Sequence, residues 1–363
     1  MKFLYLLCIL ISTNLIAQPT KNVSNKKHLK IHLKSNEVKN IIIIGENHAS
    51  AVAANIFPTI VKYLNKNNDL NKLIIECGPS EAYFYNKYLK TGNEKHLNYT
   101  IFCGSYKPWL EAWKTIYNYN KRLKKPLTVI GVDFDRARTM GYALISIFYK
   151  YENPPKFISK LMDEIKTDDF YNTYSSGYPT KKDLEWMSNV KILLKNKLTI
   201  LKKTLELEDF NLINQIIENE TIDFNNEREQ GLAKNAKRII QNIDARNFLI
   251  LIGRSHAYYK HLIKKEKQML AELLKEVPSF NLLTGAILFE GSKLRTPYNK
   301  DLKETELFEI RDKYPWKNYY NSIHKKAKHK LTLIPLNKEL NKLNCYLDYI
   351  IVAQQQAAIT LRE

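Results

Sequence analysis

Two histidines stand in the same short sequence context, far apart in the chain. Each follows a glycine by three positions, and each glycine ends an apolar run: Ile41–Ile44 precedes Gly45-Glu46-Asn47-His48, and Phe248–Ile252 precedes Gly253-Arg254-Ser255-His256. An apolar run that is too short for a helix and is bounded by glycine is typical of a buried strand. With 11 Gly and 8 His in 363 residues, chance supplies only about 0.24 such Gly-x-x-His tetrads. We therefore treat the pair as a signal.

Acidic side chains end two further strand-like runs. Glu76 follows the run Leu73–Ile75, and Asp133 follows Leu127–Val132. In an open α/β sheet, ligands bind in the crevice beyond the carboxyl ends of the strands. The side chains expected to meet in such a crevice are Glu46, His48, Glu76, Asp133 and His256.

Imidazoles beside carboxylates allow two kinds of chemistry. In the first, a neutral histidine accepts a proton from water as a general base, and a carboxylate fixes its tautomer. In the second, His48, Glu76 and His256 bind a divalent metal ion, which lowers the pKa of a bound water molecule. Both lead to hydrolysis, and the residue types do not choose between them because imidazole and carboxylate suit several metals.

Other catalytic arrangements are not supported. Neither Gly78-Pro79-Ser80-Glu81-Ala82 nor Arg254-Ser255-His256-Ala257 has the second glycine of the Gly-x-Ser-x-Gly turn that carries a nucleophilic serine. The sequence also contains no phosphate-binding loop and no dinucleotide-binding fingerprint.

The elements that must position these residues alternate between strands and helices. Strands are expected at 41–44, 73–76 and 127–133, and helices at 50–66, from Ser80 as N-cap through Leu89, and at 109–124. This alternation predicts an α/β fold with a mainly parallel central sheet flanked by helices. A helix at 227–243 leads to the second histidine motif, followed by a helix over 262–274 and strands at 282–289, 331–334 and 349–352.

The domain plan follows from these elements. Residues 40–136 form a first α/β half and 226–363 a loosely related second half. Between them, residues 137–225 carry an apolar stripe at helical spacing and read as a helical insertion that caps the crevice. The stripe consists of Trp186, Val190, Leu194, Leu198, Leu201 and Leu205.

The N-terminal sequence and the composition predict where the protein is located and what it binds. Met1 to Ala17 has the pattern of a cleavable export signal, which predicts a periplasmic or secreted protein, and residues 18–39 read as a linker. The net charge of +20 comes from lysines spread along the whole chain, so it favours weak contact with an anionic surface rather than nucleic-acid binding. We expect a small-molecule or peptide substrate, no nucleic acid and no transmembrane segment.

Taken together, the motifs resemble those of the erythromycin esterase-like branch of the superfamily that also contains the ChaN and Tiki proteins. The motifs are Gly45-Glu46-Asn47-His48, Glu76, Gly131-Val132-Asp133, Arg228-x-x-x-Leu232-Ala233-x-Asn235 and Gly253-Arg254-Ser255-His256. This superfamily is characterised by two Gly-x-x-His motifs and paired glutamates, which here are Glu46 and Glu76. The resemblance covers about residues 40–136 and 226–290 and leaves out the helical insertion.

The resemblance implies an enzyme that activates water. It makes His48 the general base, with Glu46 and Glu76 orienting it or binding a metal; His256 would be a second metal ligand or the acid, and Arg228 an anion stabiliser. Asp133 and Arg254 are expected to support these residues, Arg254 from its position alone. The leading prediction is therefore an exported hydrolase that cleaves an ester or related acyl bond. The alternatives are a ChaN-like protein that binds haem or metal without turnover and a Tiki-like metallopeptidase.

Overall fold

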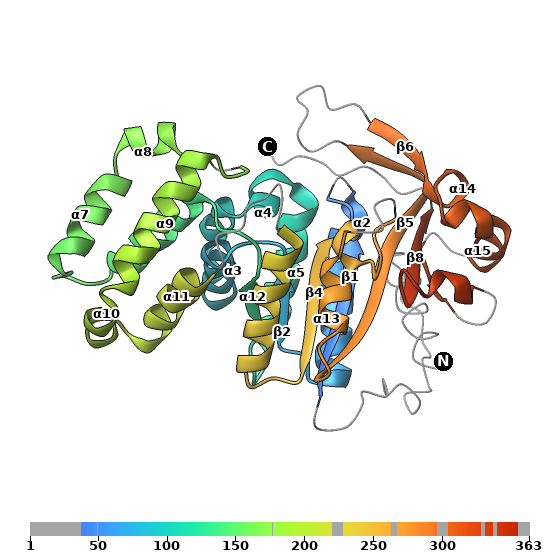
Figure 1. Cartoon of the computed structure of the whole chain (residues 1–363), viewed down its shortest axis with the longest axis horizontal. Coiled ribbons are helices and arrows are strands. Elements are labelled where there is room, and N and C mark those ends of the chain that lie inside the picture. Colours follow the sequence, from blue (N-terminus) through green and yellow to red (C-terminus); the bar gives the residue numbers. More distant parts are fainter. Residues whose placement is uncertain are drawn as a thin grey trace. The chain divides into compact units, whose positions relative to one another are not determined.

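The three-dimensional structure is a computed structural model (Figure 1). It describes residues 38–48, 50–175, 177–219, 228–262, 267–295, 304–327, 331–336 and 340–354. The predicted export signal lies outside the described residues, and so does all of the predicted linker except residues 38 and 39. The chain divides into two compact units: one contains residues 1–73, 105–127 and 240–363, and the other contains 74–104 and 128–239. These boundaries differ from those of the two predicted halves.

The first unit is built on a mainly parallel sheet. Its strands are β1 (Lys39–Glu46), β4 (Asn247–Gly253), β5 (Phe280–Arg295), β6 (Glu304–Phe308), β7 (Leu331–Pro335) and β8 (Tyr349–Gln354). They follow the order β4-β1-β5-β8-β7. The neighbours from β4 to β8 run parallel, whereas β7 pairs antiparallel with β8 and β6 pairs antiparallel with the end of β5. The predicted α/β fold with a mainly parallel sheet is confirmed.

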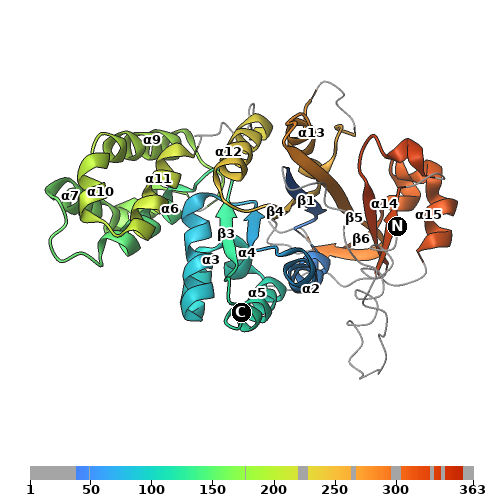
Figure 2. The ribbon, with the colours of Figure 1, turned by 90° about the horizontal axis from the view of Figure 1, so that it is seen from below.

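Helices cover both faces of this sheet, which explains why its central strands are apolar throughout. Ile41, Ile43 and Phe248 are fully buried, as expected for strands of a parallel sheet packed on both sides. Figure 2 shows α13 (Leu270–Lys275) on one side of β1 and α2 (Ala51–Asn68) on the other. On α2, Phe57 packs edge-on against Trp109 of α5 (Lys107–Asn120) at 5.9 Å between ring centroids.

The helix α2 begins directly after the first histidine motif. The hydroxyl of Ser50 accepts a hydrogen bond from the backbone N–H of Val52 at 3.2 Å and so satisfies one of the open donors at the helix start. Pro58 lies inside the helix. The cap sets where the chain turns from β1 into the helix, and it leaves His48 in the short connection between them.

The second unit is mostly helical around a short strand pair. β3 (Thr128–Gly131) lies beside β2 (Lys72–Ile75), and α3 (Pro79–Thr91), η1 (Glu94–Tyr99) and α4 (Ile101–Ser105) follow β2. The segment predicted as a helical insertion carries α6 (Ala137–Phe148), α7 (Lys156–Ile165), α8 (Asp168–Thr173), α9 (Lys181–Lys195), α10 (Leu198–Thr204) and α11 (Leu207–Glu218), and α12 (Arg228–Asn242) comes next. In the apolar stripe of this segment, Trp186, Val190, Leu194, Leu201 and Leu205 are buried in one core.

Several local expectations were wrong. The helix after β2 begins at Pro79, and Ser80 is not its N-cap. The helix expected over 262–274 forms only as α13, and residues 263–266 lie outside the described part. Between β5 and β7 the structure has α14 (Glu309–Asp312), η3 (Trp316–Tyr319) and α15 (Tyr320–Lys326) besides β6, which no pattern in the sequence predicted.

Two further features concern membrane-spanning helices and cysteines. None of the helices in the described part of the chain is long and apolar enough to span a bilayer. Cys77, Cys103 and Cys345 form no disulfide among the described residues; the first two are buried and Cys345 is exposed.

Candidate active site

The two Gly-x-x-His motifs end neighbouring parallel strands of the first unit. In the register of β1 with β4, Gly45 lies opposite Ile252 and Glu46 opposite Gly253. Each histidine follows the end of its strand: His48 in the turn before α2, and His256 in η2 (Arg254–Ala257). The structure therefore places both motifs at the same edge of one sheet, as the sequence predicts.

Gly45 is required by the close packing of these two strand ends. A Cβ atom at this position would lie 2.7 Å from the Cβ of Ala257 and 2.9 Å from the Cα of Arg254. Both distances are far below van der Waals contact, and the atoms belong to the backbone of η2 or are fixed to it. The glycine of the first motif thus lets the turn of the second motif pack directly on the end of β1.

The central pair of the site is Glu46 with His48. Nδ1 of the imidazole donates to Oε1 of the carboxylate. The Glu46 side chain is only 3% exposed, whereas that of His48 is 25% exposed. A buried carboxylate therefore fixes an imidazole that solvent can reach, and this is the arrangement that a general base for water needs.

His256 lies in the interior beside this pair. It is 6% exposed and sits in the single turn of η2, between β4 and the buried side chain of Tyr258. Its location at the rim of the sheet agrees with the prediction, while its predicted role as acid or ligand stays a prediction.

Arg254 reaches a carboxylate that the sequence analysis missed. Its guanidinium donates from Nη2 to Oε1 of Glu309 at 2.7 Å and from Nη1 to Oε2 of the same side chain. Nη1 also donates to the backbone carbonyl of Ile287 at 3.0 Å. Glu309 is 1% exposed and begins α14. Its region showed no periodic pattern, so the sequence held no signal for this contact.

The remaining predicted residues meet in the second unit. Nη2 of Arg228, at the start of α12, lies 2.5 Å from Oε1 of Glu76 and 2.6 Å from Oδ2 of Asp133. The guanidinium also lies over the ring of Phe134, 5.6 Å from its centroid. Burial works to lower the pKa of Arg228, but the charges of Asp133 and then Glu76 outweigh burial, and the pKa is raised above its ordinary value.

This contact bears on the role that the resemblance implies for Arg228. One cation shared by two carboxylates leaves a net negative group, which is a poor stabiliser for a further anion. The role of Arg228 as an anion stabiliser stays a prediction, but its two carboxylates must be displaced or outweighed for it to hold.

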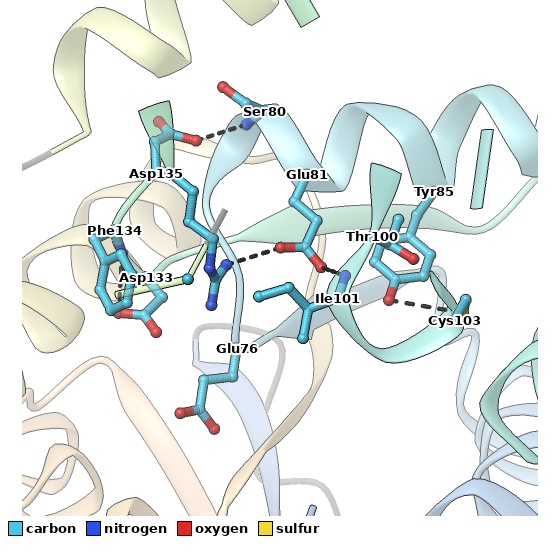
Figure 3. Close-up of polar contacts among 12 residues, drawn as sticks. Glu76, Ser80, Glu81, Tyr85, Thr100, Ile101, Cys103, Asp133, Phe134 and Asp135 are labelled. Carbon is cyan, nitrogen blue, oxygen red and sulfur yellow. Dashed lines mark hydrogen bonds and ion pairs between the residues drawn. The ribbon is translucent and has the colours of Figure 1, made fainter. Parts of the chain in front are cut away.

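A second set of buried ionic contacts surrounds the start of α3 (Figure 3). Oδ1 of Asp135 accepts a hydrogen bond from the backbone N–H of Ser80 at 2.9 Å, so Asp135 supplies the acceptor that the sequence analysis assigned to Ser80 itself. Arg136 pairs with Glu81 at 2.9 Å rather than with its neighbour Asp135. Burial raises the pKa of both Glu81 and Asp135.

The structure therefore gathers the predicted residues in two groups. Glu46, His48, Arg254 and His256 lie at the rim of the sheet in the first unit, and Glu76, Asp133 and Arg228 are joined in the second. A role for Glu76 beside His48 stays a prediction.

The described residues show no preformed metal site, and the predicted site of His48, Glu76 and His256 stays a prediction. They contain no group of three or more His, Cys, Asp or Glu side chains placed to hold a metal ion. Glu76, one of the three predicted ligands, is bonded to the guanidinium of Arg228.

No protein-family model matches the chain, and no curated protein matches it in sequence. Among solved structures, a protein from Bacillus cereus matches with a TM-score of 0.64 and 18% identity over 90% of this chain and 91% of its own. A succinoglycan biosynthesis protein matches with a TM-score of 0.64 and 14% identity over 90% of each chain.

A third solved structure is that of an erythromycin esterase. A histidine mutant of the erythromycin esterase EreC, in its open conformation, matches with a TM-score of 0.56 and 14% identity over 88% of this chain and 91% of its own. At sequence identities this low, the matches show similarity of fold only. The chain has the α/β fold of erythromycin esterase, which confirms for the fold the resemblance that its two Gly-x-x-His motifs predict.

Proposed function

We propose that the protein is a hydrolase that cleaves an ester or a related acyl bond with a water molecule activated by His48. The observation that carries this proposal is the contact between the buried carboxylate of Glu46 and the partly exposed imidazole of His48 at the end of β1. The fold supports it, because an erythromycin esterase shares that fold over most of both chains.

The mechanism follows from the geometry of this pair. With Nδ1–H donated to Glu46, the imidazole carries its lone pair on Nε2, and that nitrogen accepts the proton of the attacking water. The hydroxide that forms adds to the acyl carbon while the negative Glu46 stabilises the new imidazolium. When the tetrahedral intermediate collapses, the imidazolium returns the proton to the leaving alkoxide, and His48 is neutral again.

His256 and Arg254 frame the same rim. His256, buried at the same edge of the sheet, is the alternative to His48 as the acid of the second step. Arg254 is engaged by Glu309 and by the carbonyl of Ile287, so its charge is largely neutralised where it stands. We assign it no direct contact with the substrate.

The test begins with a hydrolysis screen. The purified protein is offered p-nitrophenyl esters, lactones and peptides, each with and without a chelator. We expect an ester or lactone to be cleaved, and we expect His48→Asn to lose that activity. The matched control is His324→Asn, because His324 is an exposed histidine on α15 that stacks on Tyr320 and should be dispensable. Full activity of folded His48→Asn would remove the proposal.

The alternatives predicted from the sequence have distinct outcomes in the same screen. A metallopeptidase would cleave peptides and lose that activity with chelator. A haem- or metal-binding protein would turn over none of the substrates and would instead bind its ligand stoichiometrically. Nothing among the described residues favours either over acyl hydrolysis. Export of the protein, as its N-terminal sequence predicts, is part of the proposal.

A further inference from the structure

Arg254 crosses the end of the strand that carries Glu46. The strand order is β4-β1-β5, so β1 lies between the strand that leads into Arg254 and the strand that accepts its hydrogen bond at Ile287. The residue before Ile287, Ala286, lies opposite Gly45 of β1. The backbone of Arg254 already lies over the end of β1, because its Cα would be 2.9 Å from a Cβ placed on Gly45. From there the side chain reaches β5, and Glu46, the residue after Gly45, lies close enough to act on its charge.

Glu309 fixes the guanidinium on the far side of this crossing. The two side chains form a bidentate pair, the geometry in which an arginine and a carboxylate bind most specifically. Glu309 is itself anchored, because its Oε2 accepts the backbone N–H of Phe289 at 3.2 Å. Glu309 is 1% exposed and the Arg254 side chain 19% exposed, so water screens the two charges only partly.

Glu46 is a second carboxylate within the field of Arg254. Burial works to lower the pKa of Arg254, and the nearby Tyr258, Glu309 and, more weakly, Glu46 raise it above its ordinary value. Glu46 also has a spare acceptor: its Oε2 is buried and has no hydrogen-bond partner among the residues that the structure describes. Two carboxylates thus compete for one guanidinium, and in the structure Glu309 holds it.

We propose that Glu309 is a positioning residue that keeps Arg254 away from Glu46, so that the Glu46 carboxylate keeps its hydrogen bond with His48. Without the negative charge of Glu309, the buried guanidinium lacks its partner and draws Glu46 toward itself. The imidazole of His48 then loses the contact that fixes its tautomer. The catalytic consequence rests on the proposed function, whereas the rearrangement of charges does not.

The test measures which ring nitrogen of His48 carries the proton. The protein is labelled with ¹⁵N-histidine, the His48 signals are assigned with His48→Asn, and ring nitrogen shifts are recorded at about pH 8, where an ordinary imidazole is neutral. The wild type should show Nδ1 protonated and Nε2 unprotonated. Glu309→Gln should shift His48 toward a mixture of tautomers. Asp312→Asn should leave His48 unchanged, although it also removes a bidentate arginine partner on α14.

A double variant separates positioning from support of the fold. If Glu309 acts through Arg254, then Glu309→Gln combined with Arg254→Met should return the His48 shifts to those of the wild type, because neither charge remains. Wild-type shifts in Glu309→Gln alone would overturn the proposal. So would a double variant that resembles Glu309→Gln, since Glu309 would then act on His48 by another route.

The second measurement is hydrolysis of a responsive ester, that is, an ester that the wild type cleaves in the screen. We expect Glu309→Gln to lower kcat by on the order of 10²-fold with KM nearly unchanged, as for a misplaced catalytic group. If the wild type cleaves no ester but the NMR shifts move as expected, the proposed function fails and the positioning role of Glu309 stands. If hydrolysis is found but the shifts do not move, the positioning role fails alone.

Discussion

Replacing Glu46 by glutamine should slow catalysis, because it weakens the contact that orients His48. The substitution keeps the shape of the side chain and removes the charge that faces Nδ1 of His48. Glu46 is 3% exposed, so water cannot replace the lost interaction. A hydrogen bond to a charged group contributes about 1.5–3 kcal/mol. At about 1.4 kcal/mol for each factor of ten, kcat should fall by about 10- to 150-fold.

The assay is steady-state hydrolysis of a responsive ester by Glu46→Gln, with folding checked by thermal unfolding. The matched control is Glu290→Gln, a carboxyl on the same sheet at β5 whose loss should change kcat by less than about twofold. KM should stay nearly constant, because the contact acts on the transition state and not on the bound substrate. A raised KM with unchanged kcat would refute the reasoning, since Glu46 would then serve binding only.

Further predictions concern the packing and charges around the two groups. Arg228→Met leaves Glu76 and Asp133 buried without their cation and should lower the free energy of unfolding in urea by about 3–5 kcal/mol. As a control, Arg238→Met breaks only the more exposed pair with Glu218 and should lower it by less than about 1 kcal/mol. Equal losses in the two variants would contradict this prediction. Gly45→Ala should cost about 1–3 kcal/mol because its Cβ meets η2, and Gly285→Ala, whose Cβ would lie 3.6 Å from the nearest atom, should cost less than about 1 kcal/mol. Burial raises the pKa of Asp135 above 3.8, so its contribution to stability is full below about pH 4 and is lost as the pH rises through the raised value. Asp135→Asn should therefore be more stable relative to the wild type at about pH 7 than at about pH 4, and the reverse order in urea unfolding would count against a buried ionised Asp135.

The sequence predicted what depends on local pattern. The runs Ile41–Ile44 and Phe248–Ile252 form strands because a short apolar segment bounded by glycine suits a sheet that is covered on both faces. Gly45, which ends the first run, also permits the close approach of η2. The Glu46–His48 contact was also within reach, since only two positions separate the residues.

What the sequence did not predict depends on contacts between distant residues. The start of α3 was misplaced because its open N–H at Ser80 is satisfied by Asp135, 55 positions away. Glu309 was missed for the same reason: its partner Arg254 is also 55 positions away, and nothing in the run around Glu309 marks it as buried. Whether a carboxylate such as Glu309 belongs to a site depends on which charged side chain contacts it, and the fold determines that contact.

Arg228 has contacts that its sequence motif did not indicate. The motif around it suggested an anion stabiliser, but in the structure Glu76 and Asp133 share its guanidinium. The same contact engages Glu76, which the sequence offered as a metal ligand. The number of carboxylates that contact Arg228 depends on the fold and could not be read from the motif.

The central claim is that His48 accepts the proton of the attacking water, and chemical rescue tests it most directly. Because the His48 side chain is 25% exposed, His48→Ala opens a space that solvent, and with it free imidazole, can enter. We expect this variant to be inactive toward the responsive ester and to regain hydrolysis as imidazole is added, with a rate that saturates, while the Glu46→Gln and His48→Ala double variant gains much less. Hydrolysis by His48→Ala at the wild-type rate without imidazole would contradict the claim.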